Sequence, residues 1–165
     1  MSPWTYRNAA ISGLRLEEYT WVGEFLEGYQ QYLIPKYRTD VYQECLAKLY
    51  YKRQWYDKAM SLLTQVSFKD ILQQINAKTL LAKIYMELRE FTALEALLES
   101  IRVYLRRKDL VGYHKENYTN IIILIQQLLK LNTFDRSAKV LLRQKIERTQ
   151  PLTERAWLLE QLDAL

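Results

Sequence analysis

The sequence predicts an all-α protein, an α-solenoid of stacked antiparallel helical hairpins that forms one domain over residues 1–165. The chain holds only four Gly and three Pro, while residues that favour helices are abundant. Over residues 78–105, apolar side chains recur at helical spacing on both sides of a break at residues 88–90. The same pattern occurs upstream at an offset of 35 residues, as repeated hairpins require.

The repeat register is clearest over residues 46–101, where small and aromatic side chains recur in the same order. Small residues let two helices approach closely, and aromatic residues fill the space between helices. Extension of the register outward predicts four hairpins that share an aromatic residue at the start of the second helix and a later Leu. The aligned positions are Ala47 with Ala82, Tyr50 with Tyr85, Tyr56 with Phe91 and Leu63 with Leu98, then Ala10, Tyr19 and Leu26 in the first copy, and Phe134 and Leu141 in the last.

The first hairpin is expected at about residues 3–34, with helices at about 3–14 and 17–34. Pro3 suits the first turn of a helix, and Pro35 should end the second helix. That second helix contains no Lys or Arg. It is therefore predicted to have an acidic outer face, formed by Glu17, Glu18, Glu24 and Glu27.

The same pattern places the remaining elements. The second hairpin is expected at about 37–66, and the third at about 70–107 with Asp70 as a helix N-cap. The fourth is expected at about 111–148, and the eight extra residues before it, roughly two helical turns, should be shared between the helix at 91–107 and the helix at about 111–131. A last helix at about 153–164 should cap the array. The first helix of the fourth hairpin should be buried on more than one side, with core residues Ile121, Ile125, Leu128 and Leu129.

Five residues of the second hairpin match the consensus of the tetratricopeptide repeats, and the chain resembles this family over residues 46–101. They are Leu46, Ala47, Tyr50, Tyr56 and Ala59. The outer hairpins depart from the consensus, for example at Gly13, where Tyr is expected. The phrases SPWTYRN, DKAMSLLTQVSFKDI and PLTERAWLLEQL are also similar to the C-terminal part of longer bacterial repeat proteins with no assigned chemistry. Both resemblances imply helical repeats rather than an enzymatic activity.

Residues that carry catalysis are scarce. The chain has one His, His114, and one Cys, Cys45, and it lacks C-x-x-C, H-E-x-x-H and glycine-rich phosphate-binding motifs. Cys45 is expected to be a reduced, partly buried thiol, and His114 a surface residue at the start of a helix. We therefore predict no enzymatic activity, no metal site and no cofactor.

The tetratricopeptide resemblance implies that the first helices of successive hairpins line a concave groove. The repeat register places mainly cationic side chains at outward positions of these helices. Such a groove suits a protein or peptide segment that carries acidic groups, because Lys and Asn donate hydrogen bonds to oxygen atoms. The predicted groove residues are Arg7, Lys48, Tyr51, Lys52, Asn76, Lys83, Met86, Gln126 and Lys130, and the register also points Glu44, Thr79 and Ile122 outward.

The sequence leaves two other functions open. If the end of the helix at 91–107 lies near the helix at 134–148, their cations would form a basic patch that contacts nucleic-acid phosphates. This patch would contain Arg102, Arg106, Arg107, Arg136, Lys139 and Arg143. Alternatively, the chain is a structural end-piece of a longer repeat protein, or it associates with itself through an open N-terminal end that presents Trp4, Ile11 and Leu14. The acidic helix at 17–34 and the basic helix at 134–148 would favour head-to-tail contact.

The N-terminal residues lack the basic and apolar regions of a signal peptide, which predicts a cytoplasmic protein. The apolar run at residues 121–125 is far shorter than the ~20 residues that a membrane helix needs. We therefore expect no membrane partner. A formal net charge of +5 favours contact with acidic partners without requiring nucleic acid.

Overall fold

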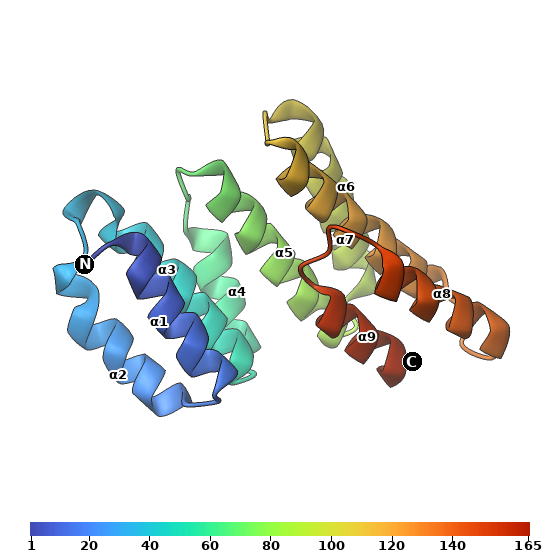
Figure 1. The fold of residues 1–165 in the computed structure, drawn as a ribbon, viewed down its shortest axis with the longest axis horizontal. Coiled ribbons are helices and arrows are strands. Elements are labelled where there is room, and N and C mark those ends of the chain that lie inside the picture. Colours follow the sequence, from blue (N-terminus) through green and yellow to red (C-terminus); the bar gives the residue numbers. More distant parts are fainter. The chain divides into compact units, whose positions relative to one another are not determined.

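The computed structural model describes residues 1–165 and contains nine α-helices, one short 3-10 helix and no β-strand (Figure 1). The all-α prediction is therefore confirmed. The helices are α1 (Pro3–Arg15), α2 (Tyr19–Tyr29), η1 (Gln30–Tyr32), α3 (Pro35–Lys52), α4 (Tyr56–Gln65), α5 (Ile71–Glu87), α6 (Phe91–Arg107), α7 (Gly112–Lys130), α8 (Arg136–Arg148) and α9 (Arg155–Ala164).

The chain groups into two compact units, Met1–Ile84 and Tyr85–Leu165, and the boundary between them lies within α5. Each unit contains fully buried apolar side chains, such as Leu26 in the first and Ile125 in the second. The expectation that residues 1–165 form one domain stays a prediction.

In the first unit, α1 and α2 form an antiparallel hairpin, α3 packs against both helices, and α4 packs against α3 (Figure 1). The ring of Tyr6 lies 5.1 Å from the ring of Phe25 in the core, and its hydroxyl donates a hydrogen bond of 2.7 Å to the carbonyl oxygen of Leu26. Ala10 and Ala47 are buried, as the repeat register predicts for small residues. The core of this unit thus joins the first three helices.

The segment between α2 and α3 differs from the prediction. The helix expected at 17–34 ends at Tyr29, a 3-10 turn follows, and the buried side chain of Leu33 anchors the chain before α3. Pro35 is the first residue of α3. Proline is well suited to this position because the first turn of a helix leaves its N–H groups unpaired and the φ of proline is already helical.

Three corners of the chain share one backbone geometry. Glu17, Gln54 and Arg89 all lie in the left-handed region, with φ of 59–60°. At the second corner, the N–H of Gln54 bonds to the carbonyl of Tyr51 at 2.9 Å, and the next N–H bonds to the carbonyl of Tyr50 at 2.8 Å. The other two corners repeat this Schellman pair of bonds. The corners are 37 and 35 residues apart, so the break predicted at residues 88–90 is confirmed and the offset of the sequence repeat recurs in the backbone.

Gly13 occupies the repeat position that carries Tyr50 in the second hairpin, and the structure explains the departure. A Cβ atom at Gly13 would lie 2.5 Å from Cγ2 of Val22 and 3.0 Å from the ring of Trp21. We expect Gly13→Ala to lower the free energy of unfolding by about 1–3 kcal/mol, because overpacking outweighs the better helix propensity of Ala. Urea denaturation measures this change. The control Gly28→Ala, where no atom lies within 4 Å of the added Cβ, should not destabilise, and equal stabilities of the two variants would contradict the prediction.

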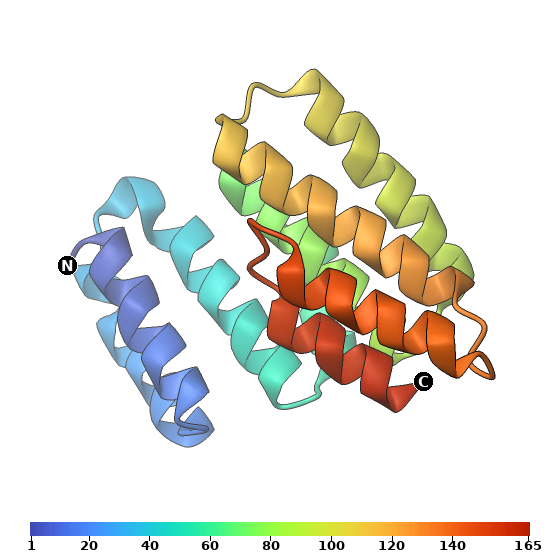
Figure 2. The same cartoon turned by 45° about the vertical axis from the view of Figure 1, so that its right-hand side comes forward.

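In the second unit, α6 and α8 each pack against α7, and α9 packs against both α7 and α8 (Figure 2). Ile121, Ile125 and Leu128 are buried as predicted, whereas Leu129 is only half-buried. The helix predicted at 153–164 is confirmed as α9, which begins at Arg155. Its apolar residues Trp157, Leu158 and Leu162 are buried. No helix combines the length and apolar character that crossing a membrane requires.

The loop between α8 and α9 is held by a buried amide of α7. The Asn117 side chain accepts a hydrogen bond of 2.8 Å from the N–H of Thr153 and donates one of 3.1 Å to its hydroxyl. Asn120 donates a hydrogen bond of 2.9 Å to the carbonyl of Pro151. These bonds attach the start of α9 to α7.

The fourth copy of the repeat, assigned from Phe134 and Leu141, stays a prediction. Phe134 is 94% exposed and Leu141 is 66% exposed, whereas Leu142 and Ile146 are buried. The helix begins two residues later than expected, at Arg136, because the carboxylate of Asp135 accepts a hydrogen bond from the N–H of Ala138 and caps it. Phe134 therefore lies in the turn before α8, and within α8 the face of Leu142 and Ile146 is buried rather than that of Leu141.

Candidate partner-binding surface

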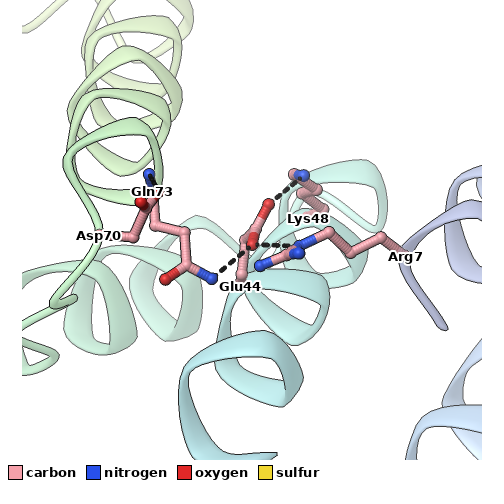
Figure 3. Close-up of polar contacts among 5 residues, drawn as sticks. All are labelled: Arg7, Glu44, Lys48, Asp70 and Gln73. Atoms are coloured by element: carbon pink, nitrogen blue, oxygen red, sulfur yellow. Dashed lines mark hydrogen bonds and ion pairs between the residues drawn. The ribbon is translucent and has the colours of Figure 1, made fainter. Parts of the chain in front are cut away.

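A polar network around Glu44 connects the first helices α1, α3 and α5 (Figure 3). The Glu44 carboxylate accepts hydrogen bonds from Nε of Arg7 at 2.8 Å, from Nζ of Lys48 at 2.7 Å and from Nε2 of Gln73 at 3.2 Å. Three helices therefore contribute donors to one carboxylate.

Local structure explains why these side chains meet. Arg7 and Glu44 are 37 residues apart and occupy the same repeat position, while Lys48 lies one turn beyond Glu44 on the same face of α3. Gln73 lies in the first turn of α5. Its N–H bonds to the carboxylate of Asp70 at 3.0 Å, so the predicted N-cap is confirmed. The cap sets the start of α5, and the amide of Gln73 then reaches Glu44.

Glu44 is a buried charge that is well compensated. It is only 7% exposed, and burial alone would raise the pKa of its carboxyl. The charges and hydrogen bonds of Lys48 and Arg7 outweigh this effect, and the pKa lies below its ordinary value. The carboxylate thus stays ionised and neutralises part of the positive charge of Arg7 and Lys48. The sequence prediction that Glu44 points outward is wrong.

Several other predicted groove residues are also misplaced. Met86 and Ile122 are buried rather than outward, and so is Thr79, whose hydroxyl bonds to the carbonyl of Ile75 within α5. Gln126 is half-buried and accepts a hydrogen bond of 2.9 Å from Arg102. The predicted groove therefore does not extend along the chain as an uninterrupted cationic surface.

Some groove residues of the first unit do lie together. The Nζ atom of Lys83 on α5 lies 5.0 Å from the ring centroid of Tyr51 on α3. Lys52 follows Tyr51 and is exposed, and Asn76 is half-buried on α5. Lys130 is exposed at the end of α7 in the second unit. The surface of α3 and α5 thus combines two lysines, one aromatic ring and the partly neutralised Lys48.

The basic patch predicted from α6 and α8 is partly neutralised. Glu99 pairs with Arg102 at 3.0 Å and with Arg106 at 3.6 Å, and Asp163 pairs with Arg143. The remaining predicted members differ in accessibility: Arg107 and Arg136 are exposed, and Lys139 is half-buried.

The two residues singled out for possible chemistry are not arranged for it. Cys45 is buried, as predicted, and burial together with the nearby Glu44 charge raises the pKa of its thiol to about 12. His114 lies near the start of α7, half-buried, with its ring edge-on to Tyr113. A thiol of this pKa is not a nucleophile at neutral pH.

Sequence reasoning missed an aromatic ladder on α2. The rings of Trp21 and Phe25 stack at 5.2 Å, those of Phe25 and Tyr29 at 5.1 Å, and Tyr32 continues the row at 5.8 Å from Tyr29. The spacing of four residues between the first three rings is a visible signal in the sequence. Comparison of the chain with protein-family models, curated proteins and solved structures gave no significant match.

Proposed function

We propose that the chain is a non-catalytic interaction module of stacked helical hairpins that binds an acidic segment of a protein partner along α3 and α5. The observation that carries the proposal is the network around Glu44. It links α1, α3 and α5, which supports a stacked arrangement of hairpins, and surrounds one carboxylate with cations from α1 and α3.

The chemistry of this surface favours an extended acidic ligand. Lys52 and Lys83 can donate charge-assisted hydrogen bonds to carboxylates, while the Tyr51 ring offers an apolar face next to the Lys83 ammonium group. Glu44 neutralises part of the charge of Arg7 and Lys48, and the exposed Lys52 adds a further cation to this surface. An acidic partner would gain both attraction over a distance and direct contacts.

The test is quantitative affinity purification from native extract with the wild-type chain and the variant Lys52→Glu/Lys83→Glu. Circular dichroism verifies that this variant keeps its fold. The matched control is Arg107→Glu/Lys115→Glu, which reverses two exposed cations of the second unit. We expect at least about tenfold weaker recovery of a specific protein with the first variant and unchanged recovery with the control.

The alternative of nucleic-acid binding makes the opposite prediction. Binding to phosphates through α6, α8 and the adjoining start of α7 should weaken with Arg107→Glu/Lys115→Glu and fall steeply between low and moderate salt. Recovery of nucleic acid with that behaviour, and of no protein sensitive to Lys52→Glu/Lys83→Glu, would overturn the proposal.

A further inference from the structure

The hairpin α1–α2 carries an apolar groove. Ala9, Ser12, Gly13 and Leu16 of the first helix and its end, together with Glu18 and Trp21, line a cavity of about 370 Å³. Trp21 is 47% exposed, and the row of rings that begins with it continues to the exposed Tyr29 and Tyr32. Nearly all of this lining is apolar.

The next hairpin shows what covers the same face. At an offset of 37 residues, Ala9 corresponds to Leu46 and Ser12 to Leu49 on α3. The preceding helix α2 packs against α3 on this side: a Cβ at Gly23 would be 3.8 Å from the Leu49 side chain, and Arg53 donates a hydrogen bond of 3.4 Å to Thr20. In the same unit, α2 thus covers the face of α3 that corresponds to this groove of the first hairpin.

A helix with suitable chemistry is present in the second unit. The outer face of α8 and the turn before it expose three apolar side chains: Phe134, Leu141 and, at 54% exposure, Val140. Lys145 and Arg148 lie on the same face at helical spacing, and both are exposed. This stripe of α8 is therefore apolar at its start and centre and basic at its end.

The two faces are complementary in charge. Residues 16–35 contain four Glu and no Lys or Arg, whereas α8 contains five cations and one Glu. The acidic side chains Glu17, Glu18 and Glu24 lie on the exposed side of α2 around Trp21. Opposite charges around apolar centres favour a specific contact over a nonspecific one.

An antiparallel alignment brings the matching features together. Trp21 and Gly28 are seven residues apart, as are Leu141 and Phe134. With Leu141 on Trp21, the turn before α8 that carries Phe134 lies toward the Gly28 end of α2, where no atom lies within 4 Å of an added Cβ and Tyr29 and Tyr32 are exposed. At the other end, the same register sets Lys145 opposite Glu17.

We infer that two copies of this chain associate head to tail, with the apolar and basic stripe of α8 of one copy in the α1–α2 groove of the other. The contact joins two different surfaces, so one copy of a pair keeps an unused groove and the other keeps an unused α8 face. Such an interface extends into chains or closes into a ring. It involves none of the residues proposed to bind an acidic partner, so the two proposals can fail separately.

Two single variants and their mixture test this inference by sedimentation velocity from micromolar to millimolar concentration. Trp21→Lys removes the aromatic ring that lines the groove. The repeat tolerates Lys at this position, because Lys58 occupies the equivalent position in the next hairpin. Leu141→Glu removes the α8 face by placing an acid opposite the acidic helix. The controls Tyr113→Lys and Val111→Glu make the same kinds of change at exposed positions elsewhere.

The wild-type chain and both controls should form species larger than dimers as concentration rises. Each single variant should associate at least about tenfold more weakly, whereas an equimolar mixture of the two should form heterodimers and stop there, since one intact face remains on each. A wild-type chain that stays monomeric throughout would overturn the inference. So would single variants that associate like the wild type, or a mixture that does not pair.

Discussion

Glu44→Gln is expected to lower the free energy of unfolding by about 2–4 kcal/mol, because it leaves the cations of Arg7 and Lys48 with no compensating charge in a largely buried setting. The neutral amide keeps the size of the side chain, so the loss reports on charge and hydrogen bonding. Urea denaturation measures it. The control is Glu99→Gln, which removes an exposed carboxylate that also contacts two arginines and should change stability by less than about 1 kcal/mol. Equal effects of the two substitutions would show that the Glu44 network contributes no more than a surface ion pair.

The same network predicts a pH dependence of stability. The pKa of Glu44 is lower in the folded chain than its ordinary value of 4.5, so its stabilising contribution is fully present above that value. The contribution is lost as the pH falls through the folded pKa. The stability difference between the wild type and Glu44→Gln should therefore be constant at neutral pH and shrink below about pH 4.5. A difference that grows on acidification would contradict the lowered pKa.

Ile125→Ala is expected to destabilise by about 2–5 kcal/mol, because its side chain is fully buried on α7 and truncation leaves a cavity there. Ile123 of the same helix provides the control, since it is 40% exposed and its truncation should have a much smaller effect. Both variants remove the same atoms from the same residue type two positions apart. Chemical denaturation of the pair therefore compares burial alone. Equal losses would mean that α7 is not enclosed as the structure describes.

Much of the local structure could be predicted because it depends on neighbours in the sequence. The bounds of α6 agree with the prediction at both ends, and Asp70 caps α5 as expected. Helix propensity, apolar spacing and capping act within a few residues, so they are readable without the fold. The same holds for the corner at residues 88–90, which recurs at the repeat offset.

The placement of charges could not be predicted in the same way. The repeat register placed Arg7 and Glu44 at equivalent positions. The prediction then assumed that side chains at equivalent positions are equally exposed to solvent. Only the packing of α1 and α5 around α3 shows that Glu44 is buried and shared by donors from three helices. A carboxylate that pairs with two cations also changes what the surrounding surface can bind. The predicted groove residues Arg7 and Lys48 are therefore partly neutralised.

What the sequence by itself determined is that the chain is helical, where most helices begin and end, and which residues share a helical face. The tertiary structure alone decided which face is covered and by what. At α8, packing against α7 and α9 buries Leu142 and Ile146 and leaves Leu141 exposed, although all three lie on the same helix. Periodicity relates side chains within one helix. Burial depends on neighbouring helices, which the chain meets only when distant segments pack together.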